Sequence, residues 1–209
     1  MSLLSRIFLA GAQTLVPATG WFLGGWAPST ALVVFWFENL ILTVLMGVRI
    51  AVQRRETRTR GHEGGFLGGF LASALTFTFA QAVFLALVLG GLLATPLDRA
   101  EIVTGVQWLL AAHAVSLTFD LFFIGRWPFS DFRGRVEWVL GRVVVVHLSL
   151  IGGMALLMMM GKPIWFFSIF VAIKIAIDLA SLLPGWKAGA VPPPFLVCVT
   201  GLLPPPKGK

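Results

Sequence analysis

The stretch STALVVFWFENLILTVLMGVRIAV, residues 29–52, decides the fold class. It is apolar almost throughout, and it exceeds the roughly 20 residues that a helix needs to cross a bilayer. Near its middle it nevertheless carries an acid, Glu38, followed by an amide, Asn39. The stretch therefore predicts a membrane-spanning helix with a polar site at mid-depth.

The composition of the whole chain agrees with this interpretation. Of the 209 residues, 57% are hydrophobic and 12% are charged, and the mean hydropathy is +0.90. A soluble domain carries about 25% charged residues. The net charge is +7, but the positive residues fall in short segments between apolar runs. We therefore expect a lipid bilayer, and no nucleic acid, as the partner.

Five further apolar runs are long enough to cross a bilayer, so the sequence predicts an all-α, polytopic integral membrane protein. One six-helix bundle is expected over residues 1–184, with spans at 3–23, 29–52, 66–93, 102–124, 138–160 and 164–183. Residues 185–209 form a proline-rich tail that we expect in the cytoplasm. The runs between the spans are too short for a soluble domain.

The positions of Lys and Arg predict the orientation of the six spans. Thirteen of the 16 fall at one end of the spans, and Arg49, near the end of the second span, is counted among them. Cytoplasmic loops carry the excess of positive residues. We therefore expect a multi-pass protein of the bacterial inner membrane with both termini in the cytoplasm.

Ionisable residues inside the spans fall at two depths, at about 1.5 Å per residue along a helix. Glu38, His113, His147 and Lys174 lie near the midplane, on four different spans. The set nearer the cytoplasm comprises Asp120, Arg142 and Asp178, and Ser116 shares a helix face with His113 and Asp120. A charge that faces lipid costs at least about 2.5–3.5 kcal/mol, so we expect these residues to point inward and pair.

The charges of the two layers nearly balance. Glu38, Asp120 and Asp178 contribute three negative charges, and Arg142 and Lys174 contribute two positive charges. One protonated histidine or one bound cation would complete the balance.

These residue types leave several functions open, including whether the protein is an enzyme. Catalytic candidates are Glu38, His113, His147, Lys174 and Asp178. Glu38, His113 and His147 could hold a divalent metal such as zinc or iron, and the two histidines could ligate a haem. The same layer could form a path for a proton, an ion or a small solute. In a third interpretation it only holds helices together, in a homo-oligomer or with a partner membrane protein.

Four motifs resemble those of a known family. They are FWFENLILTVLMGVRI, AAHAVSLTFDLFFIG, LGRVVVVHLSLIGG and VAIKIAIDL. On these motifs the chain resembles the bacterial membrane-protein family called domain of unknown function 6498, over about residues 16–183. The resemblance implies no activity. It implies as motif positions Glu38, Asn39, His113, Ser116, Arg142, His147, Lys174 and Asp178.

Overall fold

The computed structural model describes residues 15–16, 18–57, 66–91, 96–123, 136, 139–141, 143–144, 151, 168 and 170–176. These residues contain three long helices, α2 (Pro28–Thr57), α3 (Phe66–Gly91) and α4 (Arg99–Phe123), and no strand. Each helix is long and apolar enough to cross a membrane. The architecture of the described residues is thus all-helical, as predicted, and it fits a membrane protein.

The expected spans at 29–52, 66–93 and 102–124 overlap α2, α3 and α4, with ends that differ by at most five residues. The largest difference is at the end of α2, which continues to Thr57. The spans expected at 3–23, 138–160 and 164–183 lie mostly outside the described residues.

Local signals in the sequence set where α2 and α4 begin. Pro28 opens α2, a position where the missing N–H of proline costs nothing. Asp98 caps α4, because its Oδ1 accepts hydrogen bonds from the backbone N–H groups of Ala100 (2.8 Å) and Glu101 (3.1 Å). Both starts are therefore fixed by residues at the helix ends rather than by the apolar runs.

The starts of α2 and α4 lie together. Ser29 Oγ donates to the carbonyl of Pro96 at 3.1 Å, and the N–H of Asp98 donates to Thr30 Oγ1 at 3.4 Å. A contact between Arg49 and α4 joins the far parts of the two helices. The two helices therefore run in parallel, as spans separated by one intervening crossing should.

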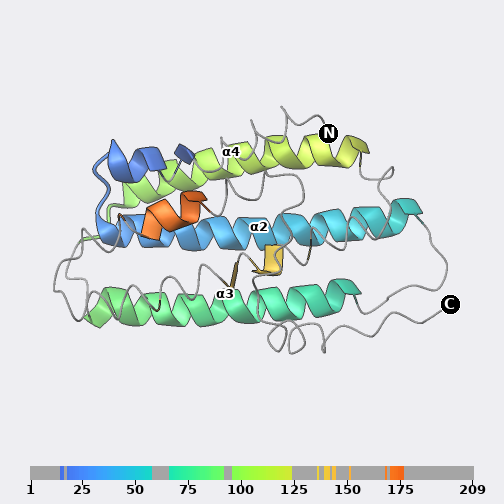
Figure 1. Ribbon diagram of the computed structural model, residues 1–209, viewed down its shortest axis with the longest axis horizontal. Coiled ribbons are helices and arrows are strands. Elements are labelled where there is room, and N and C mark those ends of the chain that lie inside the picture. The colour runs from blue at the N-terminus through green and yellow to red at the C-terminus, as the bar shows by residue number, and fades with distance from the viewer. Residues whose placement is uncertain are drawn as a thin grey trace.

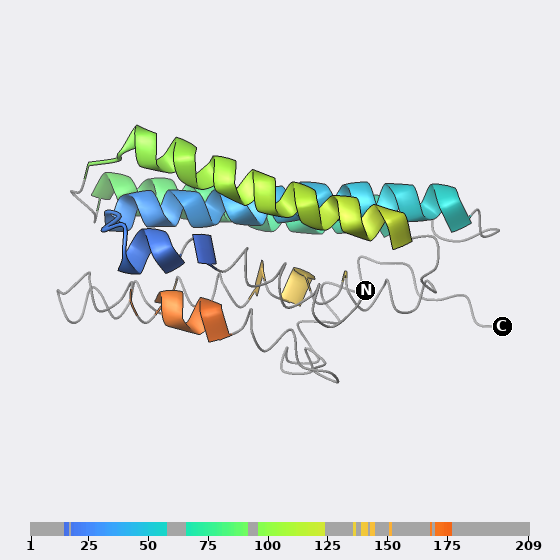
Figure 2. The ribbon, with the colours of Figure 1, turned by 90° about the horizontal axis from the view of Figure 1, so that it is seen from above.

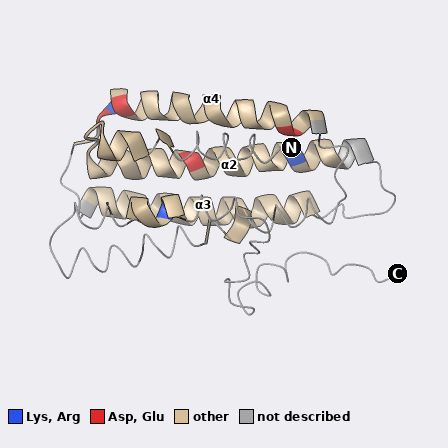
Figure 3. Cartoon of the chain, turned by 45° about the horizontal axis from the view of Figure 1, so that its top comes forward, with Lys and Arg blue, Asp and Glu red and all other residues tan. Residues whose placement is uncertain are grey.

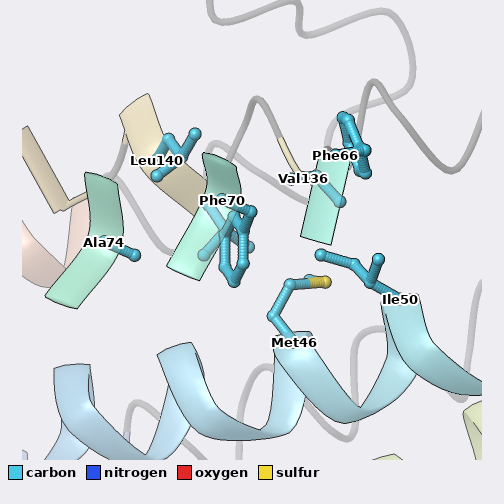
Figure 4. Close-up of a cluster of buried hydrophobic side chains, with 8 residues drawn as sticks. Met46, Ile50, Phe66, Phe70, Ala74, Val136 and Leu140 are labelled. Atoms are coloured by element: carbon cyan, nitrogen blue, oxygen red, sulfur yellow. The ribbon is translucent and has the colours of Figure 1, made fainter. Parts of the chain in front are cut away.

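Helix α2 lies between α4 and α3 and packs against both (Figure 1). Met46 and Ile50, in the second half of α2, face Phe66 and Phe70 at the start of α3 (Figure 4). Val136 joins the same buried cluster. Since the second half of α2 meets the first part of α3, these two helices are antiparallel.

The helical segment 170–176 packs beside the first half of α2. Figure 2 shows it as the orange segment below the long helices. Phe170 and Val171 share a buried cluster with Leu32 and Phe35, while Lys174, further along, reaches Glu38. The segment therefore runs in the same direction as α2, which makes α2 the central element of the described bundle.

Glycine permits a close approach of α4 to α2. A Cβ atom added at Gly105 would lie 2.8 Å from the ring of Trp26 and 3.2 Å from Val34 Cγ2. Both distances are shorter than ordinary van der Waals contact. Packing of the first half of α4 against α2 therefore requires the absence of a side chain at this position.

Several charged and polar residues are buried inside the described bundle, and several large apolar residues are exposed on its surface. Phe79, Leu87, Trp108 and Phe122 are between 64% and 76% exposed, whereas Glu38 is 1% exposed. Figure 3 shows how few positions along the three long helices are charged. Large apolar patches of this kind are rare on soluble monomers and are favourable against lipid. The distribution fits helices packed in a bilayer.

Candidate functional site

A buried ion pair joins Lys174 to Glu38. The Lys174 Nζ lies 3.1 Å from Glu38 Oε1, and the two side chains are 5% and 1% exposed. The same Nζ lies over the ring of Phe35, 5.4 Å from its centroid. The ammonium therefore faces both a carboxylate and an aromatic ring, two groups that attract a cation strongly when water is excluded.

Helical spacing explains how two short segments build this arrangement. Phe35 and Glu38 are three residues apart on α2, and Phe170 and Lys174 are four apart on the segment 170–176, so each pair shares a face. Phe170 packs edge-on against Phe35, with centroids 5.2 Å apart and an interplanar angle of 86°. This aromatic contact orients the ring beneath the ammonium. We call Phe35, Glu38, Phe170 and Lys174 the ammonium site.

A second buried ion pair joins α2 to α4. Arg49 Nε donates to Asp120 Oδ2 at 2.8 Å, and Arg49 Nη2 donates to Ser116 Oγ at 3.3 Å. The side chains of Arg49 and Asp120 are 7% and 11% exposed. Two partners one turn apart on α4 thus fix the planar guanidinium. Arg49 follows Glu38 by three helical turns, so the two ion pairs are separated by about 16 Å along α2.

His113 lies between the two ion pairs along α4 and is completely buried. Asp120 is 71 positions after its partner Arg49, and Gly105 is 71 positions after its neighbour Val34. The same offset places His113 level with position 42 of α2. This level is about 6 Å beyond Glu38 and about 10 Å before Arg49.

Amide and indole groups hold α3 against α2 near the ammonium site. Asn39 Nδ2 donates to Gln81 Oε1 at 3.2 Å, and both side chains are buried. Trp36 Nε1 donates to the backbone carbonyl of Thr78 at 3.0 Å. Buried polar side chains between membrane helices stabilise their packing when they find such partners.

The structure describes six of the nine predicted site residues. All six are buried: Glu38, Asn39, His113, Ser116, Asp120 and Lys174. It brings Glu38 together with Lys174, and Ser116 together with Asp120. The other three, Arg142, His147 and Asp178, lie outside the described residues. An ion pair of Lys174 with Asp178 therefore stays a prediction, beside the observed partner Glu38.

Arg49 is the functional candidate that the sequence reasoning missed. It was counted as one of the cytoplasmic flanking residues, but its guanidinium is buried against Asp120. Because α2 continues two turns past it, Arg49 lies within the helix rather than at its end. A signal was present, because a residue eleven positions after Glu38 shares its face.

Arg49 also corrects the predicted charge balance. The expected deficit of one positive charge omitted Arg49. In the described residues, Glu38 and Asp120 each have a basic partner, Lys174 and Arg49. These two pairs are formally neutral and require neither a protonated histidine nor a bound cation.

The residues that are described contain no group of three or more metal-ligating side chains. Of the predicted metal ligands, Glu38 is engaged by Lys174, and His147 lies outside these residues. The set of Glu38, His113 and His147, and a haem between the two histidines, therefore stay predictions.

Comparison with protein families identifies a match over most of the chain. A model described as a family of unknown function (DUF6498) matches residues 2–190. No curated protein and no solved structure matched the chain significantly. The predicted family is thus confirmed over nearly the whole chain, and the site must be interpreted from its own geometry.

Proposed function

The chain belongs to the family of unknown function DUF6498, and we propose that it couples proton movement to the passage of a small solute across a membrane. The proposed protein has six spans and lies in the bacterial inner membrane with both termini in the cytoplasm. Three apolar helices support membrane insertion. The alternating directions of α2, α3 and α4 support a chain that crosses repeatedly.

One observation carries the proposal: buried polar groups recur at about every turn along α2 and the neighbouring part of α4. With the offset of 71 positions, His113, Ser116 and Asp120 lie level with positions 42, 45 and 49 of α2. Starting from Glu38, the successive axial steps are about 6, 4.5 and 6 Å. Gln53, also buried, lies one turn further. We call this series the polar track.

Four members of the polar track, Glu38, His113, Ser116 and Asp120, have proton chemistry suited to their places. When Glu38 takes up a proton, it loses its negative charge and Lys174 loses a partner. The loss of this ion pair removes an attraction that holds Lys174 at Glu38, so the change favours movement of Lys174 and its segment. An imidazole such as that of His113 can accept a proton on one nitrogen and release one from the other. A hydroxyl at Ser116 both accepts and donates, and leads to the carboxylate of Asp120.

Two observations favour this function over a resident metal or a reaction centre. The Glu38 carboxylate has a covalently tethered cation, Lys174, as its partner. The second carboxylate, Asp120, is held by Arg49. Paired charges inside a membrane bundle are typical of proton relays and ion pathways, where breaking and remaking a pair drives the cycle.

Proton flux into liposomes tests the proposal. The full chain is reconstituted with a pH-sensitive dye inside, and flux is driven by a potassium diffusion potential. We expect Glu38→Gln to reduce flux to the level of protein-free liposomes. Asp98→Asn is the matched control, since it makes the same acid-to-amide change at an exposed helix cap that an amide also fills. Equal flux through the wild type and Glu38→Gln would overturn the proposal.

A further inference from the structure

We infer that the ammonium site is a binding site for an organic ammonium ion, which Lys174 occupies in the described conformation. The inference rests on the proposed function and names the class of solute that would be carried. Three of its features point to this class: the two groups around the ammonium, the origin of the ammonium on a different segment from these groups, and the burial of the pair.

The groups around Lys174 Nζ suit an ammonium better than a metal ion. One carboxylate oxygen lies at 3.1 Å, and one aromatic ring face lies 5.4 Å away, measured to its centroid. A ring face attracts alkylammonium ions by its quadrupole. Hard cations such as Mg²⁺ and Ca²⁺ instead require about six oxygen ligands. A carboxylate beside a ring face is therefore a pair of groups that suits an ammonium ion.

The cation and its receptor come from different segments. Glu38 and Phe35 belong to α2, whereas Lys174 and Phe170 belong to the segment 170–176. If the segment 170–176 moves, the ammonium and the edge-on ring leave together, and the carboxylate and ring face remain on α2. The site is then negatively charged and aromatic, and open to a cation from solution.

Charge balance makes the exchange of cations favourable. Glu38 is 1% exposed, and loss of the ion pair with Lys174 would remove a close positive charge from a carboxylate that water does not reach. A monovalent ammonium restores neutrality, and so does a proton on Glu38. Lys174, the solute and the proton therefore compete for the same carboxylate, which is the requirement for coupling.

The first test measures ammonium binding when Lys174 has been shortened. Full-length Lys174→Ala in nanodiscs is titrated with n-propylammonium chloride, which supplies the lost ammonium, and with sodium chloride. We expect a saturable rise in Tm of about 2–4 °C with n-propylammonium only, the size expected for a ligand well above its Kd in a chain of this length. An equal rise with sodium, or the same rise in Lys174→Ala/Glu38→Gln, would overturn the inference.

The second test uses the wild-type chain and so does not depend on a variant that folds. Reductive methylation of Lys174 is quantified by mass spectrometry, with Lys209 in the tail as an internal reference. Tetramethylammonium, which the reagent does not modify, should raise the methylation of Lys174 saturably, and sodium should not. In Phe35→Leu, about tenfold more tetramethylammonium should be needed, because a desolvated cation–π contact is lost. Unchanged methylation of Lys174 at saturating tetramethylammonium would overturn the inference.

The two proposals can fail separately. Proton flux that depends on Glu38, without an effect of either ammonium ion, would overturn the ammonium site and leave the polar track as a proton path. Ammonium binding that depends on Glu38, without proton flux even when tetramethylammonium is supplied to the liposomes, would leave the binding site and overturn the coupled transport.

Discussion

The ammonium of Lys174 lies 3.1 Å from a carboxylate oxygen of Glu38, and both side chains are buried. This pair connects the segment 170–176 to the first half of α2, two parts of the chain that are far apart in sequence and adjacent in space. Since α2 also contacts α3 and α4, the pair links the central helix to a further part of the chain. Substitution of these two residues therefore distinguishes an ion pair that only stabilises the fold from one that also takes part in proton movement.

Removal of one partner should cost far more stability than removal of both. Glu38→Gln or Lys174→Met alone leaves a buried charge without its partner, and each should lower the free energy of unfolding by about 3–5 kcal/mol. The double variant Glu38→Gln/Lys174→Met leaves no charge and should recover most of this loss. Unfolding in mixed micelles measures all four proteins. Additive losses would show that the two side chains do not interact.

The contact of Arg49 with α4 should depend on charge more than on the hydroxyl. Asp120→Asn keeps the shape but leaves the guanidinium without its carboxylate, so a loss of about 3 kcal/mol is expected. Ser116→Ala removes only the weaker 3.3 Å bond and should cost about 1 kcal/mol. The same unfolding measurement compares the two. Equal losses would contradict the assigned partners.

A methyl group at Gly105 should push α4 away from α2. The added Cβ would lie 2.8 Å from the ring of Trp26, so Gly105→Ala should lower stability by about 1–3 kcal/mol. Gly68→Ala in α3 is the matched control, because among the described residues no atom outside the adjoining turns of α3 lies within 4 Å of its added Cβ. It should leave stability unchanged or raise it slightly. Similar losses in both variants would contradict the close approach of the helices.

The proposed orientation predicts that the start of α4 faces away from the cytoplasm. Leu97 is exposed just before α4. In a Cys198→Ser background, Leu97→Cys should react with a membrane-impermeant maleimide in intact spheroplasts. Lys209→Cys, in the tail, should react only after permeabilisation. The reverse pattern of labelling would show that the chain is inserted in the opposite orientation.

The sequence predicted the helical class and the two charged residues of the ammonium site, Glu38 and Lys174, for a physical reason. Apolar runs have no stable alternative to a helix in lipid, because every backbone polar group must be satisfied within the segment. Depth along such helices then follows from residue number alone. This is why Glu38 and Lys174 were assigned to one layer, and why they form a pair in the structure.

Arg49 shows what the sequence reasoning could not resolve. An arginine near a predicted helix end can extend into water or turn back into the bundle, and residue number does not distinguish the two. The direction of the Arg49 side chain depends on Asp120, which lies on another helix at the same depth and close enough to accept its hydrogen bond. The role of Phe35 was missed for a similar reason. A phenylalanine that faces an ammonium and one that only packs against other side chains look the same in the sequence, and they differ only in the direction of the ring face.

The most direct test of the account is proton flux through the double variant Glu38→Gln/Lys174→Met in liposomes. This variant separates structure from function, because it should recover stability and still lack the carboxylate that takes up the proton. We predict a folded protein whose flux equals that of protein-free liposomes. Wild-type flux from the folded double variant would contradict the central claim and leave the ion pair as a packing contact.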